Sequence, residues 1–192
     1  MKGRMKVNRT TRPLEEEEYK AIVELLENGF ELNGIKIRPK TDLVVALQLQ
    51  ANLGLRIGDV LRLKVENFKQ DKLETVEQKT GKLQWRQIHP MITATIKDYA
   101  IEKGLKSDDR LFDFDVRNAQ KYLSLAAKKL NLNHIGSHSL RKMFCSKVYD
   151  ETRDLELVKE LLNHTSVATT QRYVRVSQQR INEVSSRVYF NN

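Results

Sequence analysis

Two arginines in separate motifs are the side chains of this sequence best suited to bind a phosphate group. Arg56 lies in the stretch Gly-Leu-Arg-Ile-Gly-Asp, and Arg141 lies in the stretch His-Ser-Leu-Arg. A phosphodiester resists cleavage because its anionic oxygens repel a nucleophile and gain charge in the transition state. Arginine meets that charge well, since its planar guanidinium stays protonated and donates two parallel hydrogen bonds to phosphate oxygens. The two motifs therefore predict a phosphate site that works without a metal ion.

Two histidines and a tyrosine add groups that could move protons or attack the phosphate. His138 lies three residues before Arg141, which on a helix places both side chains on one face. His164 begins the segment that ends in Tyr173, nine residues later. A phenol has a pKa of about 10 and needs a proton acceptor and cationic surroundings to attack at neutral pH. Five other tyrosines compete for this role: Tyr19, Tyr99, Tyr122, Tyr149 and Tyr189.

Two lysines lie in the turn of a predicted β-hairpin. Between Leu73 and Ile88 the apolar residues are spaced as in two strands, and the stretch Lys-Thr-Gly-Lys at residues 79–82 separates them with a glycine. The oxygen that leaves a cleaved phosphodiester must gain a proton, and an ammonium group on a mobile hairpin suits that task. Lys79 and Lys82 are both candidates for this general acid.

The order of these motifs along the chain resembles that of the tyrosine recombinase (phage integrase) family, and the resemblance covers residues 13–173. It implies that Tyr173 is the nucleophile, because the nine-residue step from His164 matches the family's spacing. It also implies that His164 forms a hydrogen bond with a phosphate oxygen. By the same resemblance, His138 handles a proton near the tyrosine hydroxyl.

The resemblance also concerns the lysines and one acidic residue. The family carries its catalytic lysine on a β-hairpin, and alignment of the motif favours Lys79 over Lys82. Asp59 stands three residues after Arg56, where the family usually has an acid, commonly glutamate. We expect Asp59 to orient Arg56 or a histidine. An ordinary acid on a helix surface is the alternative interpretation.

The family resemblance implies an enzyme that cuts and rejoins double-stranded DNA through a 3′-phosphotyrosyl intermediate, with no metal, nucleotide or other cofactor. Recombination of this kind needs four protomers on two DNA sites, and an accessory DNA-bending protein is a further candidate partner. Two other functions stay open: a type IB topoisomerase uses the same catalytic residues to relax DNA, and a non-catalytic DNA-binding regulator would share the charge and the helical pattern. The intact set of six catalytic positions argues against the regulator.

The chain carries a strong positive charge, with 34 lysines and arginines against 25 acidic residues and a net charge of +9. This balance favours an anionic partner such as nucleic acid. Residues 1–12 show no apolar periodicity and predict a flexible basic arm or interdomain linker, which either touches DNA or is only solvated. The candidate DNA-binding residues are Lys2, Arg4, Lys6, Arg9, Arg12 and Lys82.

The sequence predicts neither a metal site nor a membrane span. His134 and His138 are four residues apart, but Gly136 and Ser137 break the helix that zinc binding at this spacing requires. The single cysteine, Cys145, allows no internal disulfide and is expected to pack in the core, in a reducing compartment. No apolar run reaches the roughly 18 residues of a membrane span, so we expect a soluble, cytoplasmic protein.

Apolar periodicity predicts a mainly helical fold with a small antiparallel sheet. We expect a catalytic domain over residues 13–176, and a C-terminal segment over residues 177–192 that is exchanged between protomers or packs on its own chain. A turn is predicted at Asn33-Gly34. Helices are predicted over residues 15–26, 41–53, 92–101, 116–130, 140–149, 155–162 and 178–188.

The family usually places a helical core-binding domain before the catalytic domain, whereas here a short basic arm precedes it. We therefore expect either an excised catalytic fragment or a short recombinase made of the catalytic domain alone, such as the fimbrial-switch invertases. The target DNA sequence does not follow from these motifs, since base readout depends on which helix faces reach the grooves.

Overall fold

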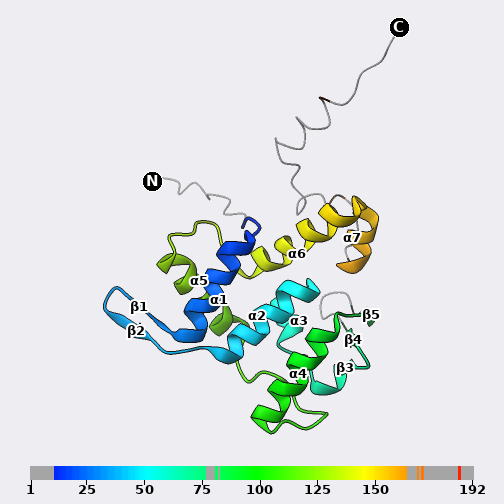
Figure 1. Ribbon diagram of the computed structural model, residues 1–192, viewed down its shortest axis with the longest axis horizontal. Helices are drawn as coiled ribbons and strands as arrows, with labels where there is room; N and C mark the ends of the chain where they lie inside the picture. Colours follow the sequence, from blue (N-terminus) through cyan, green and yellow to red (C-terminus); the bar gives the residue numbers. More distant parts are fainter. Residues whose placement is uncertain are drawn as a thin grey trace, which may run out of the picture. The chain divides into compact units, whose positions relative to one another are not determined.

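The computed structural model describes residues 11–76, 81, 83–163, 168, 170 and 186. Helices α1 to α7 and strands β1 to β5 follow one another along this part of the chain (Figure 1). Two compact units are present, one ending at Phe144 and the other beginning at Cys145, so that the division falls inside helix α6 (Ser137–Thr152). The predicted fold class, mainly helical with small antiparallel sheets, is confirmed.

Helix α1 (Glu16–Asn28) leads into a small hairpin. The helix begins with three acidic residues, whose charge is favourable at the positive end of the helix dipole. Strands β1 (Phe30–Leu32) and β2 (Ile35–Ile37) are antiparallel and joined at Asn33 and Gly34. Both turn residues have positive φ, 52° and 76°, which a two-residue hairpin turn requires and which asparagine and glycine adopt readily. The predicted turn is confirmed, and the two short strands beside it are an addition.

Helix α2 (Thr41–Leu53) is apolar on most of its surface and is buried on several sides, as a helix in the interior of a domain must be. It packs against α1 and against the short helix α3 (Ile57–Val60). Gly54 ends α2 in the left-handed conformation, with φ 63° and ψ 14°, and its N–H donates to the Gln50 carbonyl at 2.9 Å. The prediction of a buried helix that stops at Gly54 is confirmed.

The second sheet contains the predicted lysine hairpin. Its three strands, β3 (Phe68–Lys69), β4 (Lys72–Val76) and β5 (Leu83–Gln87), are antiparallel in that order. Leu73 of β4 lies opposite Arg86 of β5, and Val76 lies opposite Leu83 next to the turn. The predicted hairpin is therefore confirmed, while Lys79 and Lys82 lie outside the described residues.

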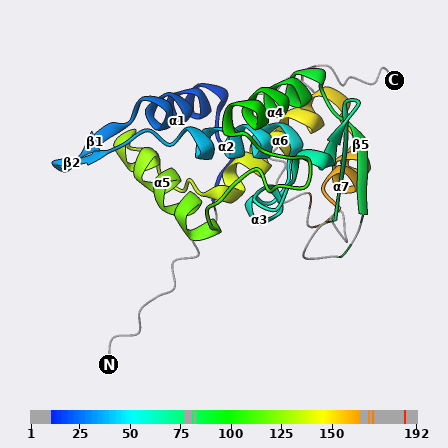
Figure 2. The same cartoon turned by 90° about the horizontal axis from the view of Figure 1, so that it is seen from below.

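Three long helices and one short one complete the described chain (Figure 2): α4 (Pro90–Lys103), α5 (Val116–Lys129), α6 and α7 (Leu155–Leu161). Asp115 caps α5, since its carboxylate accepts the N–H of Asn118 at 2.7 Å. Helix α5 packs against α1, and its buried face includes Leu123 and Ala126. Cys145 is buried, as predicted. The helix predicted over residues 178–188 lies outside the described part of the chain.

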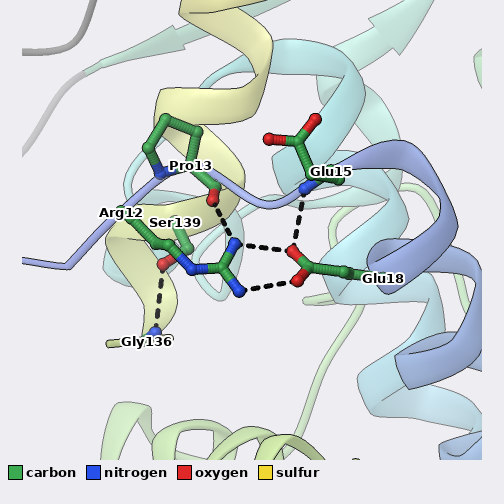
Figure 3. A network of polar contacts seen from close by, with 6 residues as sticks. All are labelled: Arg12, Pro13, Glu15, Glu18, Gly136 and Ser139. Atoms are coloured by element: carbon green, nitrogen blue, oxygen red, sulfur yellow. Dashed lines mark hydrogen bonds and ion pairs between the residues drawn. The ribbon is translucent and has the colours of Figure 1, made fainter. Parts of the chain in front are cut away.

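Arg12 is held at the start of α1 by a network of polar contacts (Figure 3). Its guanidinium forms two hydrogen bonds of 2.6 Å with the two carboxylate oxygens of Glu18 and a third, of 3.0 Å, with the Pro13 carbonyl. Glu18 also accepts the N–H of Glu15 at 3.0 Å. The side-chain hydrogen bond with Arg12 holds the pKa of Glu18 below its ordinary value. A bidentate pair of this kind fixes both side chains.

The same segment reaches the region before α6. The Arg12 N–H donates to the His134 carbonyl at 3.0 Å, and the ammonium of Lys142 donates to the Thr11 carbonyl. Arg12, predicted as part of a flexible arm, is thus fixed to the folded domain by backbone and side chain. Residues 1–10, which hold the other predicted basic side chains of the arm, lie outside the described residues. None of the described helices is long and apolar enough to cross a membrane.

Candidate active site

The turn between α2 and α3 carries Arg56. Three side chains from other positions in the chain donate hydrogen bonds to the backbone of this turn. A helix leaves its last carbonyl groups without partners inside the helix, and such groups need partners when buried. Here three consecutive carbonyl oxygens accept hydrogen bonds from side chains. The pairs are Leu53 with Arg86 Nη2, Gly54 with Arg141 Nη1 at 2.7 Å, and Leu55 with Gln50 Nε2 at 3.3 Å.

Arg141 lies in the first two turns of α6 and is almost completely buried, with 1% of its surface exposed. The start of this helix is fixed by the Ser139 hydroxyl, which accepts the N–H of Gly136 at 3.1 Å (Figure 3). A buried charge is costly unless hydrogen bonds hold it. Because Arg141 donates to Gly54, two residues before Arg56, the two arginine motifs meet at one turn.

Arg56 occupies the position just before α3, with an extended backbone and a side chain 23% exposed. Asp59 follows one turn later and is 3% exposed. Its Oδ2 lies 3.9 Å from Arg56 Nη1, and its Oδ1 lies 2.6 Å from Arg62 Nη2. Asp59 is therefore a buried carboxylate between two guanidinium groups rather than an acid on a helix surface. This geometry fits the predicted partnership with Arg56, and it adds Arg62 to it.

Arg86 is a third arginine at the same turn. It lies on β5, and its Nη2 donates to the Leu53 carbonyl. Burial, together with the positive charge of Arg141, lowers the pKa of Arg86 to about 10. The guanidinium thus stays protonated at neutral pH, beside a second buried cation. The ring of Phe144 lies 5.8 Å from its guanidinium carbon, within range of a cation–π contact.

His138 lies in the first turn of α6, one helical turn before Arg141, and its side chain is exposed. This placement on the same helix is the one predicted from the spacing. His134 lies in the turn before the helix with a positive φ of 61°, so the two histidines do not share a helix face. Within the part of the chain that the structure describes, no three His, Cys, Asp or Glu side chains are arranged to hold a metal ion.

The remaining predicted catalytic residues, Lys79, His164 and Tyr173, lie outside the described residues. Two of the competing tyrosines have pKa values raised above that of a solvated phenol. Burial, with a smaller effect from Glu27, raises the pKa of Tyr19 to about 12. Burial and Asp42, which accepts a hydrogen bond from the Tyr99 hydroxyl at 3.0 Å, raise the pKa of Tyr99 well above its ordinary value. Both phenols are thus harder to deprotonate than a solvated one.

Sequence reasoning missed three side chains that build this site: Gln50, Arg62 and Arg86. Gln50 lies among apolar residues of a buried helix, and a buried amide in such a helix is itself a signal that a backbone group nearby needs a partner. Arg62 follows Asp59 at helical spacing, which is a signal of pairing. Arg86 gives no signal of this kind, because its partner is a backbone oxygen more than thirty residues away in the chain.

Comparison with proteins of known sequence finds relatives along most of the chain. The model of the phage integrase family matches residues 12–180. A probable integrase/recombinase of Bacillus subtilis, YoeC, is 33% identical over 136 residues, which are 66% of this chain and 74% of that protein. The tyrosine recombinase XerC of Natranaerobius thermophilus is 30% identical over 156 residues, 71% of this chain and 51% of that protein. The chain thus spans about half the length of this second relative.

Comparison with solved structures shows the fold. The crystal structure of XerA recombinase superposes with a TM-score of 0.72 at 19% identity, over 95% of this chain and 66% of that one. At this identity the agreement concerns the arrangement of helices and strands and not the chemistry. The relationship in sequence rests on two observations: the family model matches most of the chain, and YoeC is 33% identical. The chain belongs to the phage integrase family.

Proposed function

We propose that this chain is the catalytic part of a site-specific DNA recombinase, which cuts DNA and rejoins the ends to new partners. One observation carries the proposal: in a member of the phage integrase family, the buried Arg141 donates a hydrogen bond to Gly54, in the turn that carries Arg56. Two fixed guanidinium groups suit a phosphate that gains charge in the transition state. Asp59 orients Arg56 by ion pairing at 3.9 Å.

The reaction is a transfer of the phosphoryl group from one oxygen to another. The phenolic oxygen of Tyr173 attacks the phosphorus, the bond to the 5′ oxygen breaks, and the 3′ phosphate is left covalently on the tyrosine. His138 receives the phenolic proton, and Lys79 gives a proton to the departing 5′ oxygen. Attack by the 5′-hydroxyl of another strand reverses these steps and releases the enzyme. The phosphotyrosyl bond keeps the energy of the phosphodiester, so no nucleotide is consumed.

The non-bridging phosphate oxygens are bound by Arg56, Arg141 and His164. Double-stranded DNA is the partner, and four protomers act on two sites within the cytoplasm. Residues 177–192 join neighbouring protomers in this arrangement, and residues 1–10 with Lys82 add positive charge toward the DNA backbone. An accessory DNA-bending protein brings the two sites together. Family membership and the net charge of +9 support this assembly.

Covalent capture tests the proposal on duplexes of many sequences at once, so the target sequence need not be chosen in advance. The protein is incubated with nicked duplexes of random sequence, and DNA that stays attached in hot detergent is recovered and sequenced. We expect the wild-type chain to enrich one sequence class, Tyr173→Phe to capture nothing, and Tyr149→Phe to behave as wild type. Capture should continue in excess EDTA and without nucleotide, because no step needs a metal ion.

Three results would contradict the proposal in different ways. Capture with no preferred sequence, together with relaxation of supercoiled plasmid, would indicate a type IB topoisomerase. Sequence-selective binding without covalent capture would indicate a DNA-binding regulator. An adduct that survives Tyr173→Phe would remove the nucleophile assignment.

A further inference from the structure

Arg86 joins two parts of the site that are far apart in sequence. It lies on β5, the strand that follows residues 77–82 in the chain, and its guanidinium donates to the carbonyl of Leu53 at the end of α2. The next carbonyl along, that of Gly54, accepts from Arg141 at 2.7 Å. Two guanidinium groups thus bind neighbouring carbonyls of the turn that carries Arg56.

The contact is reinforced by an aromatic ring. The guanidinium carbon of Arg86 lies 5.8 Å from the centre of the Phe144 ring. The same ring lies against Gly54, where an added Cβ would come within 2.3 Å of a ring carbon. The Phe144 ring therefore packs between Arg86 and Gly54. Arg86 can move little without displacing the ring or the turn.

The pairing of β4 with β5 links Arg86 to the strand that precedes residues 77–82. Arg86 pairs with Leu73 on β4, and Leu73 is fully buried in the core. The same strand carries exposed Trp85 and Leu83 between Arg86 and the turn. Among the described residues of β5 whose side chains can be placed, Arg86 is the one less exposed than its neighbours. It therefore fixes how the hairpin stands relative to the end of α2.

We infer that Arg86 is a positioning residue, which ties the lysine hairpin to the turn that carries Arg56. It acts through the Leu53 carbonyl and the β5 backbone, and the proposed general acid Lys79 depends on this contact to reach the phosphate. A misplacement of about 1 Å can slow a reaction by a factor of about a hundred. This inference rests on the proposed recombinase function and extends it.

Arginine suits this position better than lysine or an apolar residue. Its guanidinium offers a flat face for Phe144 and an N–H for the Leu53 carbonyl at the same time, whereas an ammonium offers only the donor. A methionine fills similar volume and leaves the carbonyl without its partner. The two variants Arg86→Lys and Arg86→Met thus separate loss of the flat face from loss of the hydrogen bond.

The test compares two substrates in a single round of cleavage, using a duplex obtained by covalent capture with the wild-type chain. One substrate carries an ordinary phosphodiester, and the other carries a 5′-bridging phosphorothiolate, whose sulfur leaves without a proton. We expect Arg86→Met to cleave the ordinary DNA about a hundredfold more slowly than wild type and to recover most of that loss on the phosphorothiolate. DNA affinity should stay unchanged, and Arg86→Lys should fall between Arg86→Met and wild type. Gln87→Ala, an exposed neighbour on the same strand, is the control and should match wild type on both substrates.

The outcomes are distinct. An equal slowing on both substrates would overturn the inference, because it would locate the defect at the arginines and not at the general acid. An unchanged rate in Arg86→Met would overturn it as well. If Arg86→Met does not unfold cooperatively on heating, Arg86→Lys and Phe144→Leu carry the same comparison. If wild-type protein captures no DNA, the proposed function fails and the role of Arg86 fails with it, whereas a wild-type adduct with unchanged Arg86 variants removes the role of Arg86 alone.

Discussion

Arg141 donates a hydrogen bond of 2.7 Å to the carbonyl of Gly54, the glycine that ends α2 two residues before Arg56. A side chain that was predicted to bind phosphate is thus also part of the framework that places the other arginine. Because the proposed phosphate ligand and this framework contact share one guanidinium, changes at this turn are expected to affect stability and cleavage together.

Replacement of Gly54 by alanine should destabilise the fold. The new Cβ would lie 2.3 Å from the Phe144 ring, and the residue would keep a positive φ of 63°. The left-handed conformation costs about 1 kcal/mol for a residue with a side chain, and crowding adds roughly 1–3 kcal/mol. Gly104→Ala is a matched control, since Gly104 also ends a helix with a φ of 65° and its added Cβ meets nothing within 4 Å. Chemical denaturation should show the larger loss for Gly54→Ala, and equal losses would contradict the crowding argument.

Replacement of Lys79 by alanine should slow cleavage of ordinary DNA by orders of magnitude. The loss should be much smaller on a 5′-bridging phosphorothiolate, because a sulfur leaving group needs no proton. Lys82→Ala, at the other end of the same turn, should have a milder effect on both substrates. If the phosphorothiolate restores Lys82→Ala and not Lys79→Ala, the general acid is Lys82.

Replacement of Glu18 by glutamine should lower the melting temperature at neutral pH. The hydrogen bond from Arg12 depresses the pKa of Glu18 below its ordinary value of 4.5, so its contribution to stability is present above that value. This contribution is lost as the pH falls through the depressed pKa. Melting curves from pH 7 down to pH 3 should therefore show the variant and the wild type converging. Glu17→Gln, exposed in the same helical turn, should follow the wild type throughout.

Deletion of residues 1–10 should weaken DNA binding and make it less dependent on salt. The segment carries Lys2, Arg4, Lys6 and Arg9, and each lost phosphate contact should reduce the slope of log affinity against log salt by about 0.9. Arg12→Gln serves as the comparison, because Arg12 is paired with Glu18 and should change thermal stability more than the slope. An unchanged slope after the deletion would make the arm a passive tail.

The elements that could be predicted from sequence are those with a strong local signal. Helix α2 has apolar residues on most of its surface and a glycine at its end, and the lysine hairpin has strand-like spacing on either side of a glycine turn. The apolar pattern of helix α6 starts at residue 140, whereas the helix begins at Ser137, as its polar first turn with His138 and Arg141 indicates. Strands β1 and β2 were missed because three residues are too few to show an alternation.

The candidate site could be proposed from residue types in the sequence, whereas the contacts that support it could not. The motifs around Arg56 and Arg141 mark these two residues as candidates, and the spacing of Asp59 from Arg56 marks the carboxylate. Gln50 and Arg86 act on backbone carbonyls, so no charged or apolar pattern in the sequence marks their partners. Arg12 looked like one more charge in a basic arm, and only the folded chain shows the carboxylate of Glu18 beside it.

The three carbonyl groups held by Gln50, Arg86 and Arg141 also bear on how such a domain can diverge. A substitution at one donor removes the hydrogen bond that its carbonyl oxygen accepts, while the other two donors are already bonded to the neighbouring carbonyl groups. Changes at the three positions should therefore affect one another more than changes at distant positions do. Libraries that vary all three together should therefore yield combinations whose stability differs from the sum of the single substitutions, so this turn is expected to diverge by coupled changes.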